Sequence, residues 1–293
     1  MKKMLFVMNP YAGTRKANRH LADILTIFNR ADYRVEVYMT AGRGDGEKMV
    51  AKRASKMDLV VCCGGDGTFN ETVSGVLKSK GNPPIGYIPA GSTNDFARTL
   101  GLTDPILKAA QRIVDGNPEE VDVGQFGKRY FTYVASFGAF TRASYATPQN
   151  IKNALGHTAY LLEGISELSQ IKKERVKIEL DDEIIEDDFL FGAICNSTSV
   201  GGILTLDPKQ VDMADGKFEI LLVRAPRDLA EIAECIQAVQ KQVYNCKMIT
   251  FRSASSVKIT PPEDMPWTLD GEREDGHSFV EVRNLPHAIQ IMK

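Results

Sequence analysis

The chain has 293 residues, of which 43% are hydrophobic and 25% charged, and its net charge at pH 7 is −2. This length suits two domains or one large domain with a sizeable core, and the near-neutral charge argues against nucleic acid as the main partner, because that role usually needs a basic surface. The five cysteines lack the spacing of a disulfide framework or of a metal site, so we expect the reducing cytoplasm.

The first 120 residues alternate between predicted strands and predicted helices. Uninterrupted or alternating apolar residues predict strands at 5–8, 34–39, 59–63 and 85–88. Apolar residues at helical spacing predict helices over about 15–30, up to about 56, and from 69 to 77. This alternation is typical of a doubly wound α/β domain, in which ligands bind at the carboxyl ends of the strands.

The pattern changes after residue 120. Strands are predicted at 121–126, 130–137, 176–180, 189–196, 218–223, 256–259 and 279–282, several of them separated by turn residues. Helices are predicted only at about 153–170 and 229–243. We therefore predict an α/β domain over 1–120 and a mostly antiparallel β domain over 121–293, and the final strand could return to the first domain.

One stretch in the first half combines a buried strand, a glycine turn and a helix. Residues 64–68 read Gly-Gly-Asp-Gly-Thr directly after the apolar residues 59–63. Glycine lets the backbone approach a ligand closely, and the amino end of the following helix suits a phosphate group. Asp66 would repel a phosphate, so it indicates a bound Mg²⁺ or a place beside the phosphoryl group in transfer. The alternative is a tight turn whose Asp caps the helix.

Two further loops follow predicted strands in the same way, at residues 9–13 and 89–98. The carboxyl ends of parallel strands meet at one edge of a sheet, so the three loops should lie side by side. Each could instead be a capped helix start, with Thr93 or Asn94 as the capping residue of the third. Three such loops together, two of them with an Asp, favour a nucleotide-phosphate site.

These motifs together resemble the bacterial diacylglycerol kinase-like lipid kinases. The resemblance rests on residues 9–13 (Asn-Pro-Tyr-Ala-Gly), on 64–71 (Gly-Gly-Asp-Gly-Thr-Phe-Asn-Glu), on 91–98 (Gly-Ser-Thr-Asn-Asp-Phe-Ala-Arg) and on 269–272 (Leu-Asp-Gly-Glu). The superfamily also holds sphingosine kinases and, more remotely, NAD kinases and phosphofructokinases. The motif at 64–68 does not separate a lipid kinase from a NAD kinase, whereas 91–98 is similar to the diacylglycerol kinase form.

The resemblance implies Mg²⁺-dependent transfer of a phosphoryl group from ATP to a lipid hydroxyl, in a cleft between the α/β domain and a β-sandwich domain. Asp66 and Asp95 would organise Mg²⁺ and the phosphates, and Glu272 would be the general base. The residues that would hold the nucleotide are Asn9, Pro10, Tyr11, Ala12, Gly13, Thr40, Gly64, Gly65, Asp66, Gly67, Thr68, Phe69, Asn70 and Thr93.

The family also implies a second metal site near Asp212, Asp215 and Lys217, with Lys217 acting through its backbone because an ammonium group cannot be a ligand. The alternative is a solvated Asp-Gly hairpin turn. Glu272 likewise has an alternative as part of a charged turn, since three charged residues follow it at 273–275.

A lipid acceptor implies a cytoplasmic protein that is peripheral at the inner membrane surface, and no apolar run is long enough to span a membrane. Diacylglycerol or a related lipid alcohol is the expected acceptor, and a homodimer is compatible with the sequence. Two other functions remain open: a kinase of a soluble acceptor such as NAD, and a nucleotide- or lipid-binding regulator without catalysis.

Overall fold

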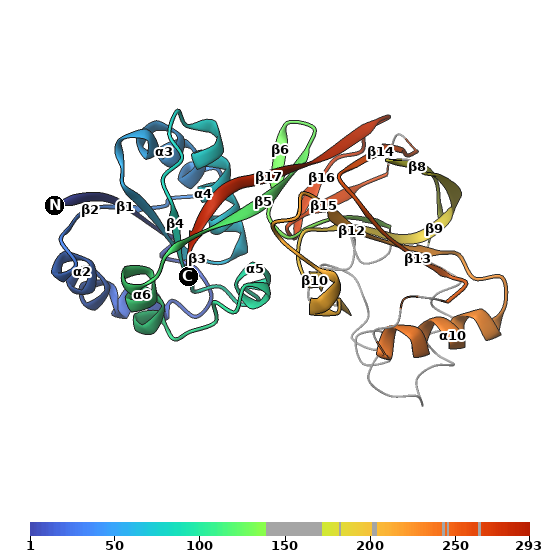
Figure 1. The fold of residues 1–293 in the computed structure, drawn as a ribbon, viewed down its shortest axis with the longest axis horizontal. Coiled ribbons are helices and arrows are strands. Elements are labelled where there is room, and N and C mark those ends of the chain that lie inside the picture. Colours follow the sequence, from blue (N-terminus) through green and yellow to red (C-terminus); the bar gives the residue numbers. More distant parts are fainter. Residues whose placement is uncertain (139–171, 182, 201–203, 242–243, 245, 263–264) are drawn as a thin grey trace. The chain divides into compact units, whose positions relative to one another are not determined.

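The computed structural model describes residues 1–138, 172–181, 183–200, 204–241, 244, 246–262 and 265–293. These residues form two compact units: residues 1–123 with 285–293, and residues 124–284 (Figure 1). The helix predicted over 153–170 lies outside the described residues.

The first unit is built on a parallel sheet with strand order β2-β1-β3-β4. The carboxyl end of β17 joins it, since Ile291 lies opposite Ile85 of β4 in parallel register. The elements of this unit are β1 (Lys2–Met8), α1 (Lys16–Arg19), α2 (Leu21–Arg30), β2 (Tyr33–Met39), α3 (Asp45–Arg53), η1 (Ala54–Lys56), β3 (Leu59–Gly64), α4 (Asp66–Lys78), β4 (Ile85–Pro89), α5 (Asp95–Thr99), α6 (Ile106–Asp115), most of β5 (Pro118–Phe126) and the end of β17 (Val280–Met292).

Helices cover both faces of this sheet. On one face, alternate residues of β1 pack in a common core with apolar residues of α2 and α6. On the other face α3 packs against α4, and Figure 1 shows this pair on the opposite side of the sheet from α2 and α6. Strand β3 is fully buried, as its uninterrupted apolar sequence predicts.

The second unit is an antiparallel β structure. One run of paired strands has the order β16-β15-β7-β9-β8-β14-β17, and β12 pairs with both β9 and β13. The fully buried Trp267 lies at the centre of its core, with its ring centroid 5.0 Å from those of Phe126 and Phe137. The elements are β6 (Arg129–Phe131), β7 (Val134–Gly138), β8 (Glu174–Leu180), β9 (Glu183–Cys195), β10 (Ser199–Val200), β11 (Leu204–Thr205), η3 (Pro208–Gln210), β12 (Phe218–Arg224), α10 (Leu229–Gln240), β13 (Ile249–Ala254), β14 (Ser256–Thr260), β15 (Trp267–Leu269) and β16 (Glu272–Glu274).

The predicted fold class, an α/β domain followed by a mostly antiparallel β domain, is confirmed. Two predicted elements were wrong in detail. The helix over 15–30 is two helices, because His20 leaves the helical conformation and its N–H donates to the Ala17 carbonyl, which ends α1. The strand over 130–137 is interrupted at Thr132 and Tyr133, whose backbone amides bind a side chain that is distant in sequence.

Other strands are longer than predicted: β9 begins at Glu183, and β17 continues to Met292. Among the helices of the described residues, none combines the length and the apolar character that crossing a bilayer requires.

Candidate functional site

The three glycine-containing loops of the first unit touch one another. Gly13 has φ +49°, and a Cβ atom added there would lie 2.4 Å from the Ala90 carbonyl oxygen. A Cβ atom at Gly91 would lie 2.5 Å from the Cα of Gly65. Neither contact tolerates a larger residue, so glycine is required for the loops at 9–13, 64–68 and 89–94 to meet at one edge of the sheet.

Asn9 ties the first loop to the second. Its backbone N–H donates to the Cys63 carbonyl (3.0 Å), and its Nδ2 donates to Thr68 Oγ1 (3.2 Å). Its Oδ1 accepts from the N–H of Tyr11 (2.9 Å), which shapes the turn that contains Pro10 and Ala12. The Tyr11 ring is 67% exposed and lies 5.2 Å from the Arg15 guanidinium group.

The amino end of α4 faces this meeting point of the loops. Gly65, the residue before the helix, has no side chain that could cap it. The amino end of a helix offers backbone N–H groups and a partial positive charge, which suit an anion. Gly67 and Thr68 lie in the first turn, and the buried Phe69 stacks on Phe96 of α5 with ring centroids 4.3 Å apart.

Two carboxylates come from neighbouring loops at this edge. Asp66 Oδ1 accepts from the Phe96 N–H (3.3 Å), which links the starts of α4 and α5. Asp95, the first residue of α5, is only 2% exposed. Asn94 before it has φ +53° and its Oδ1 accepts from the Gly91 N–H (3.0 Å), while Thr93 is exposed.

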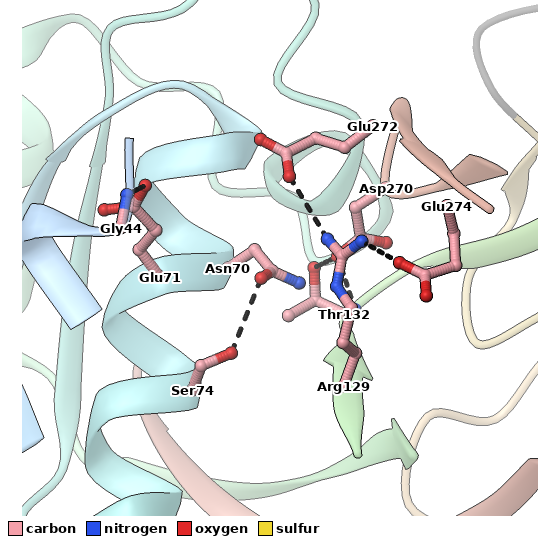
Figure 2. A network of polar contacts seen from close by, with 9 residues as sticks. All are labelled: Gly44, Asn70, Glu71, Ser74, Arg129, Thr132, Asp270, Glu272 and Glu274. Atoms are coloured by element: carbon pink, nitrogen blue, oxygen red, sulfur yellow. Dashed lines mark hydrogen bonds and ion pairs between the residues drawn. The ribbon is translucent and has the colours of Figure 1, made fainter. Parts of the chain in front are cut away.

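Thr40 and Glu71 connect the site to α3. Thr40 is buried at the end of β2, and its N–H donates to the Met8 carbonyl (2.8 Å). The Glu71 carboxylate accepts from the N–H groups of Gly44 (2.6 Å) and Gly46 (3.0 Å) at the amino end of α3, and Figure 2 shows the Gly44 contact. Asn70 lies beside it on α4, where the Ser74 hydroxyl reaches its Oδ1 at 3.5 Å. From the sequence, Glu71 could form a hydrogen bond within the nucleotide site, or could simply be an acid in the first turn of a helix, which needs no special role.

In the second unit, Glu272 directly follows a two-residue hairpin turn. Asp270 and Gly271 have φ values of +49° and +80°, and Leu269 of β15 pairs with Glu272 of β16. Positive φ at both central residues is the signature of type I′ hairpins, for which Asp-Gly is a favoured sequence. The Glu272 side chain is 35% exposed.

The Asp270 carboxylate is buried among backbone amides. It accepts from the Thr132 N–H (2.6 Å) and hydroxyl (2.8 Å), from the Tyr133 N–H (2.9 Å) and from the Val134 N–H (3.1 Å). Burial raises the pKa of Asp270, and these hydrogen bonds oppose the rise because they stabilise the carboxylate. The Thr132 and Tyr133 amides lie in the interruption between β6 and β7, which explains why that predicted strand is broken, and Val134 is the first residue of β7.

Arg129 lies between two carboxylates, as Figure 2 shows. One terminal nitrogen lies 3.2 Å from Glu272 Oε2, and the other contacts Glu274. Glu274 also contacts His277 Nε2 (3.1 Å). Burial raises the pKa of Glu274, but its hydrogen bonds to Arg129 and His277 outweigh burial and leave that pKa below the ordinary value. No local signal in the sequence marks Arg129, because its partners are 143 and 145 residues away.

The predicted second metal loop forms two short turns. Asp212 accepts from the Ala214 N–H (3.0 Å), and Asp215 accepts from the Lys217 N–H (2.9 Å). The described residues include no group of three His, Cys, Asp or Glu side chains placed to hold a metal ion. Asn284 of β17 reaches this loop, since its Nδ2 donates to the Lys217 carbonyl (2.9 Å). Two buried oxygens, Glu219 Oε2 and Asn284 Oδ1, have no hydrogen-bond partner among the described residues. Burial and the charges of Asp215 and Asp212 raise the pKa of Glu219 to about 8.

Comparison with known proteins gives consistent matches along the chain. The family model of the diacylglycerol kinase catalytic domain matches residues 3–126, and that of the YegS C-terminal NAD kinase beta sandwich-like domain matches 134–293. The diacylglycerol kinase of Bacillus subtilis is 33% identical over 93% of this chain and 90% of its own, and that of Staphylococcus epidermidis RP62A is 34% identical over 99% and 92%. A solved structure of a candidate diacylglycerol kinase from Bacillus anthracis is similar with a TM-score of 0.82 and 27% identity, over 99% of this chain and 97% of that one.

Proposed function

This chain belongs to the diacylglycerol kinase family, and we propose that it transfers the γ-phosphoryl group of ATP to the hydroxyl of diacylglycerol or a related lipid alcohol. The product is phosphatidic acid or an analogous lipid phosphate. The reaction takes place at the cytoplasmic face of a membrane, because the acceptor resides there.

The observation that carries this proposal is the contact of three glycine loops at the amino end of α4. Glycines let the loop backbone come close to a ligand, and the amino end of a helix favours the negative charge of a polyphosphate. Asn9, Thr40, Thr68 and Thr93 lie on the loops and strand ends of the same unit and are assigned to the nucleotide. Phosphoryl transfer depends mainly on positioning and charge neutralisation, which such a cradle provides.

Asp66 and Asp95 are assigned to the catalytic Mg²⁺. The described residues hold no set of three acidic or imidazole ligands, so the protein would supply one or two carboxylates there. That number is typical of Mg²⁺ sites, which complete their coordination with water and substrate phosphates. When bound, the ion neutralises the charge that develops on the transferring phosphoryl group.

Glu272 is assigned as the general base. Its carboxylate takes the proton of the lipid hydroxyl while the hydroxyl oxygen forms a bond to the γ-phosphorus and the bond from that phosphorus to the ADP oxygen breaks. A carboxylate placed by a tight hairpin, with part of its surface exposed, can reach an incoming hydroxyl group.

Asp212, Asp215 and the Lys217 carbonyl are assigned to a second divalent cation. Their donor atoms are oxygens, as Mg²⁺ prefers, and the two buried oxygens without partners nearby agree with a missing positive charge. This cation would stabilise the segment and take no part in the transfer.

The acceptor is tested by transfer of radiolabelled γ-phosphate from ATP in mixed micelles with Mg²⁺, against diacylglycerol, monoacylglycerol, ceramide, sphingosine and undecaprenol, with NAD as the soluble acceptor. We expect label in diacylglycerol. Label in another lipid would keep the mechanism and change the acceptor. Label in NAD alone, or no label from protein that binds ATP, would overturn the proposed function.

The role of Glu272 is tested by Glu272→Gln, which keeps the size of the side chain and removes its basicity. We expect kcat to fall by about 100-fold or more, with an unchanged midpoint of thermal unfolding. Glu179→Gln, at a partly exposed carboxylate of β8 that binds Lys177, is the matched control and should retain activity. Wild-type turnover in Glu272→Gln would remove this residue from the mechanism.

A further inference from the structure

We propose that Asp270 and Arg129 are positioning residues that together fix the Glu272 carboxylate in its working place. This inference rests on the proposed role of Glu272 as the base. Neither residue is assigned to contact the substrate: Asp270 holds the backbone of the hairpin that carries Glu272, and Arg129 holds the end of its side chain.

The geometry of the turn alone does not explain why residue 270 carries a negative charge. A type I′ turn needs residues that accept positive φ, and Asn or Gly satisfy that need without a charge. Here the carboxylate is turned inward, is 5% exposed, and accepts four hydrogen bonds from Thr132, Tyr133 and Val134. The Asp270 N–H also donates to the Val134 carbonyl (2.9 Å), so five hydrogen bonds join the turn to one short segment.

Burying a carboxylate is unfavourable unless hydrogen-bond donors compensate for the lost contact with water, so the position of Asp270 depends on these donors. The turn cannot shift along β7 without leaving a buried charge and several amides unpaired. Glu272 is two residues from Asp270, at the first position of β16, so fixing the turn also fixes the backbone of Glu272.

Arg129 acts on the other end of Glu272. The planar guanidinium group of Arg129 binds one oxygen of the Glu272 carboxylate, which restricts the rotamers of this 35% exposed side chain. Glu274 binds the second nitrogen of Arg129 and is itself held by His277, so the guanidinium group cannot rotate freely. Backbone and side chain of Glu272 are thus restrained by separate partners.

Catalysis is sensitive to this kind of restraint, because a misplacement of about 1 Å can lower a rate by about 100-fold. We therefore expect Arg129→Met and Asp270→Asn each to lower kcat by about 10- to 100-fold, with the KM for ATP unchanged. Asn keeps the positive φ of the turn but presents an amide donor to the N–H groups, so Asp270→Asn tests the carboxylate and spares the turn.

The chain offers matched controls in the same unit. Arg175 also lies between two carboxylates, Glu186 (3.1 Å) and Asp188 (3.7 Å), and Asp181 accepts from the N–H and hydroxyl of Ser255 (3.2 Å each). Arg175→Met and Asp181→Asn should leave kcat unchanged. Thermal unfolding of every variant identifies any loss of activity that follows from misfolding.

The deciding experiment repeats both substitutions in the Glu272→Gln background. If Asp270 and Arg129 act through Glu272, each double variant should have the kcat of Glu272→Gln alone, within about twofold. A further loss in the double variants would show that they act by another route and would overturn the inference, as would wild-type kcat in folded Arg129→Met and Asp270→Asn. A fully active Glu272→Gln would instead remove the proposed base, so the two failures are distinguishable.

Discussion

Two single carboxylates in this chain, those of Glu71 and Asp270, hold loops in place by accepting hydrogen bonds from backbone amides. Glu71 binds two amides at the start of α3, and Asp270 binds three amides and a hydroxyl group. A charged acceptor makes such hydrogen bonds stronger than a neutral one does. Glu71 thereby fixes the loop that follows Thr40, and Asp270 attaches the turn before Glu272 to a segment that is distant in the sequence.

At Glu71, replacement by Gln should loosen the loop that follows Thr40. The amide keeps one oxygen, but its NH₂ group faces the N–H of Gly44 or Gly46, so the free energy of unfolding should fall by about 1–3 kcal/mol. ATP affinity should fall as well if Thr40, which precedes this loop, binds the nucleotide as proposed. Urea unfolding and calorimetric titration with ATP measure the two effects.

Glu47→Gln is the control, because Glu47 of α3 and Lys78 of α4 form an ion pair between the same two helices (2.7 Å). Both side chains are partly exposed, Glu47 at 32% and Lys78 at 44%. Loss of this ion pair should change the free energy of unfolding by less than about 1 kcal/mol. Equal effects of the two substitutions would mean that Glu71 only joins the helices.

Among the elements, the start of α10 depends on charge as well as on local sequence. Asp228 accepts from the Glu231 N–H (2.9 Å), and the Glu231 carboxylate accepts from the Arg227 N–H (2.9 Å) and from Arg224 of β12 (2.6 Å). This reciprocal arrangement resembles a capping box and also attaches the helix to the sheet. The Arg224 contact and the Arg227 amide lower the pKa of Glu231 from 4.5 to about 2.

A lowered pKa in the folded state gives stability that depends on pH. The contribution of Glu231 should be complete above about pH 4.5 and should disappear as the pH falls towards about 2, where the folded carboxylate gains its proton. Glu231→Gln should therefore unfold at a lower temperature than the wild type at pH 7, with a smaller difference at pH 3. Thermal unfolding followed by circular dichroism measures this, and a difference that does not change with pH would contradict it.

In the whole molecule, the chain passes from the first unit to the second within β5 and returns within β17. The returning residues complete the first unit: Ile291 is fully buried opposite Ile85, and Lys293 exchanges two backbone hydrogen bonds with Asn117 (2.8 and 3.1 Å). The stability of the α/β unit therefore depends on residues from the far end of the sequence.

Ile291→Ala should thus destabilise the first unit, by about 2–5 kcal/mol, through the lost apolar contacts and the cavity that remains. Urea unfolding gives the magnitude, and limited proteolysis with mass spectrometry locates the first cleavages in residues 1–123. Ile184→Ala, at a side chain of β9 that is 65% exposed, should change stability by no more than about 0.5 kcal/mol. Similar effects of the two substitutions would contradict the dependence.

The sequence by itself determined the elements and motifs that rest on neighbouring residues. The apolar run at 59–63 makes a fully buried parallel strand, and Asp-Gly at 270–271 forms the hairpin turn. The alternation of strands and helices gave the fold class, because periodicity and turn chemistry are local properties. The glycine motifs after three predicted strands also indicated that these loops lie together, and the structure shows their contacts.

Only the tertiary structure decided which distant groups meet. Asp270 interrupts a predicted strand 138 residues away, and Arg129 reaches Glu272 across 143 residues. The end of β17 pairs with β4, which lies within the first 90 residues, and so settles the return of the final strand that the sequence left open. A hydrogen bond or an ion pair depends on the path of the chain between its partners, and no pattern of neighbouring residues records that path.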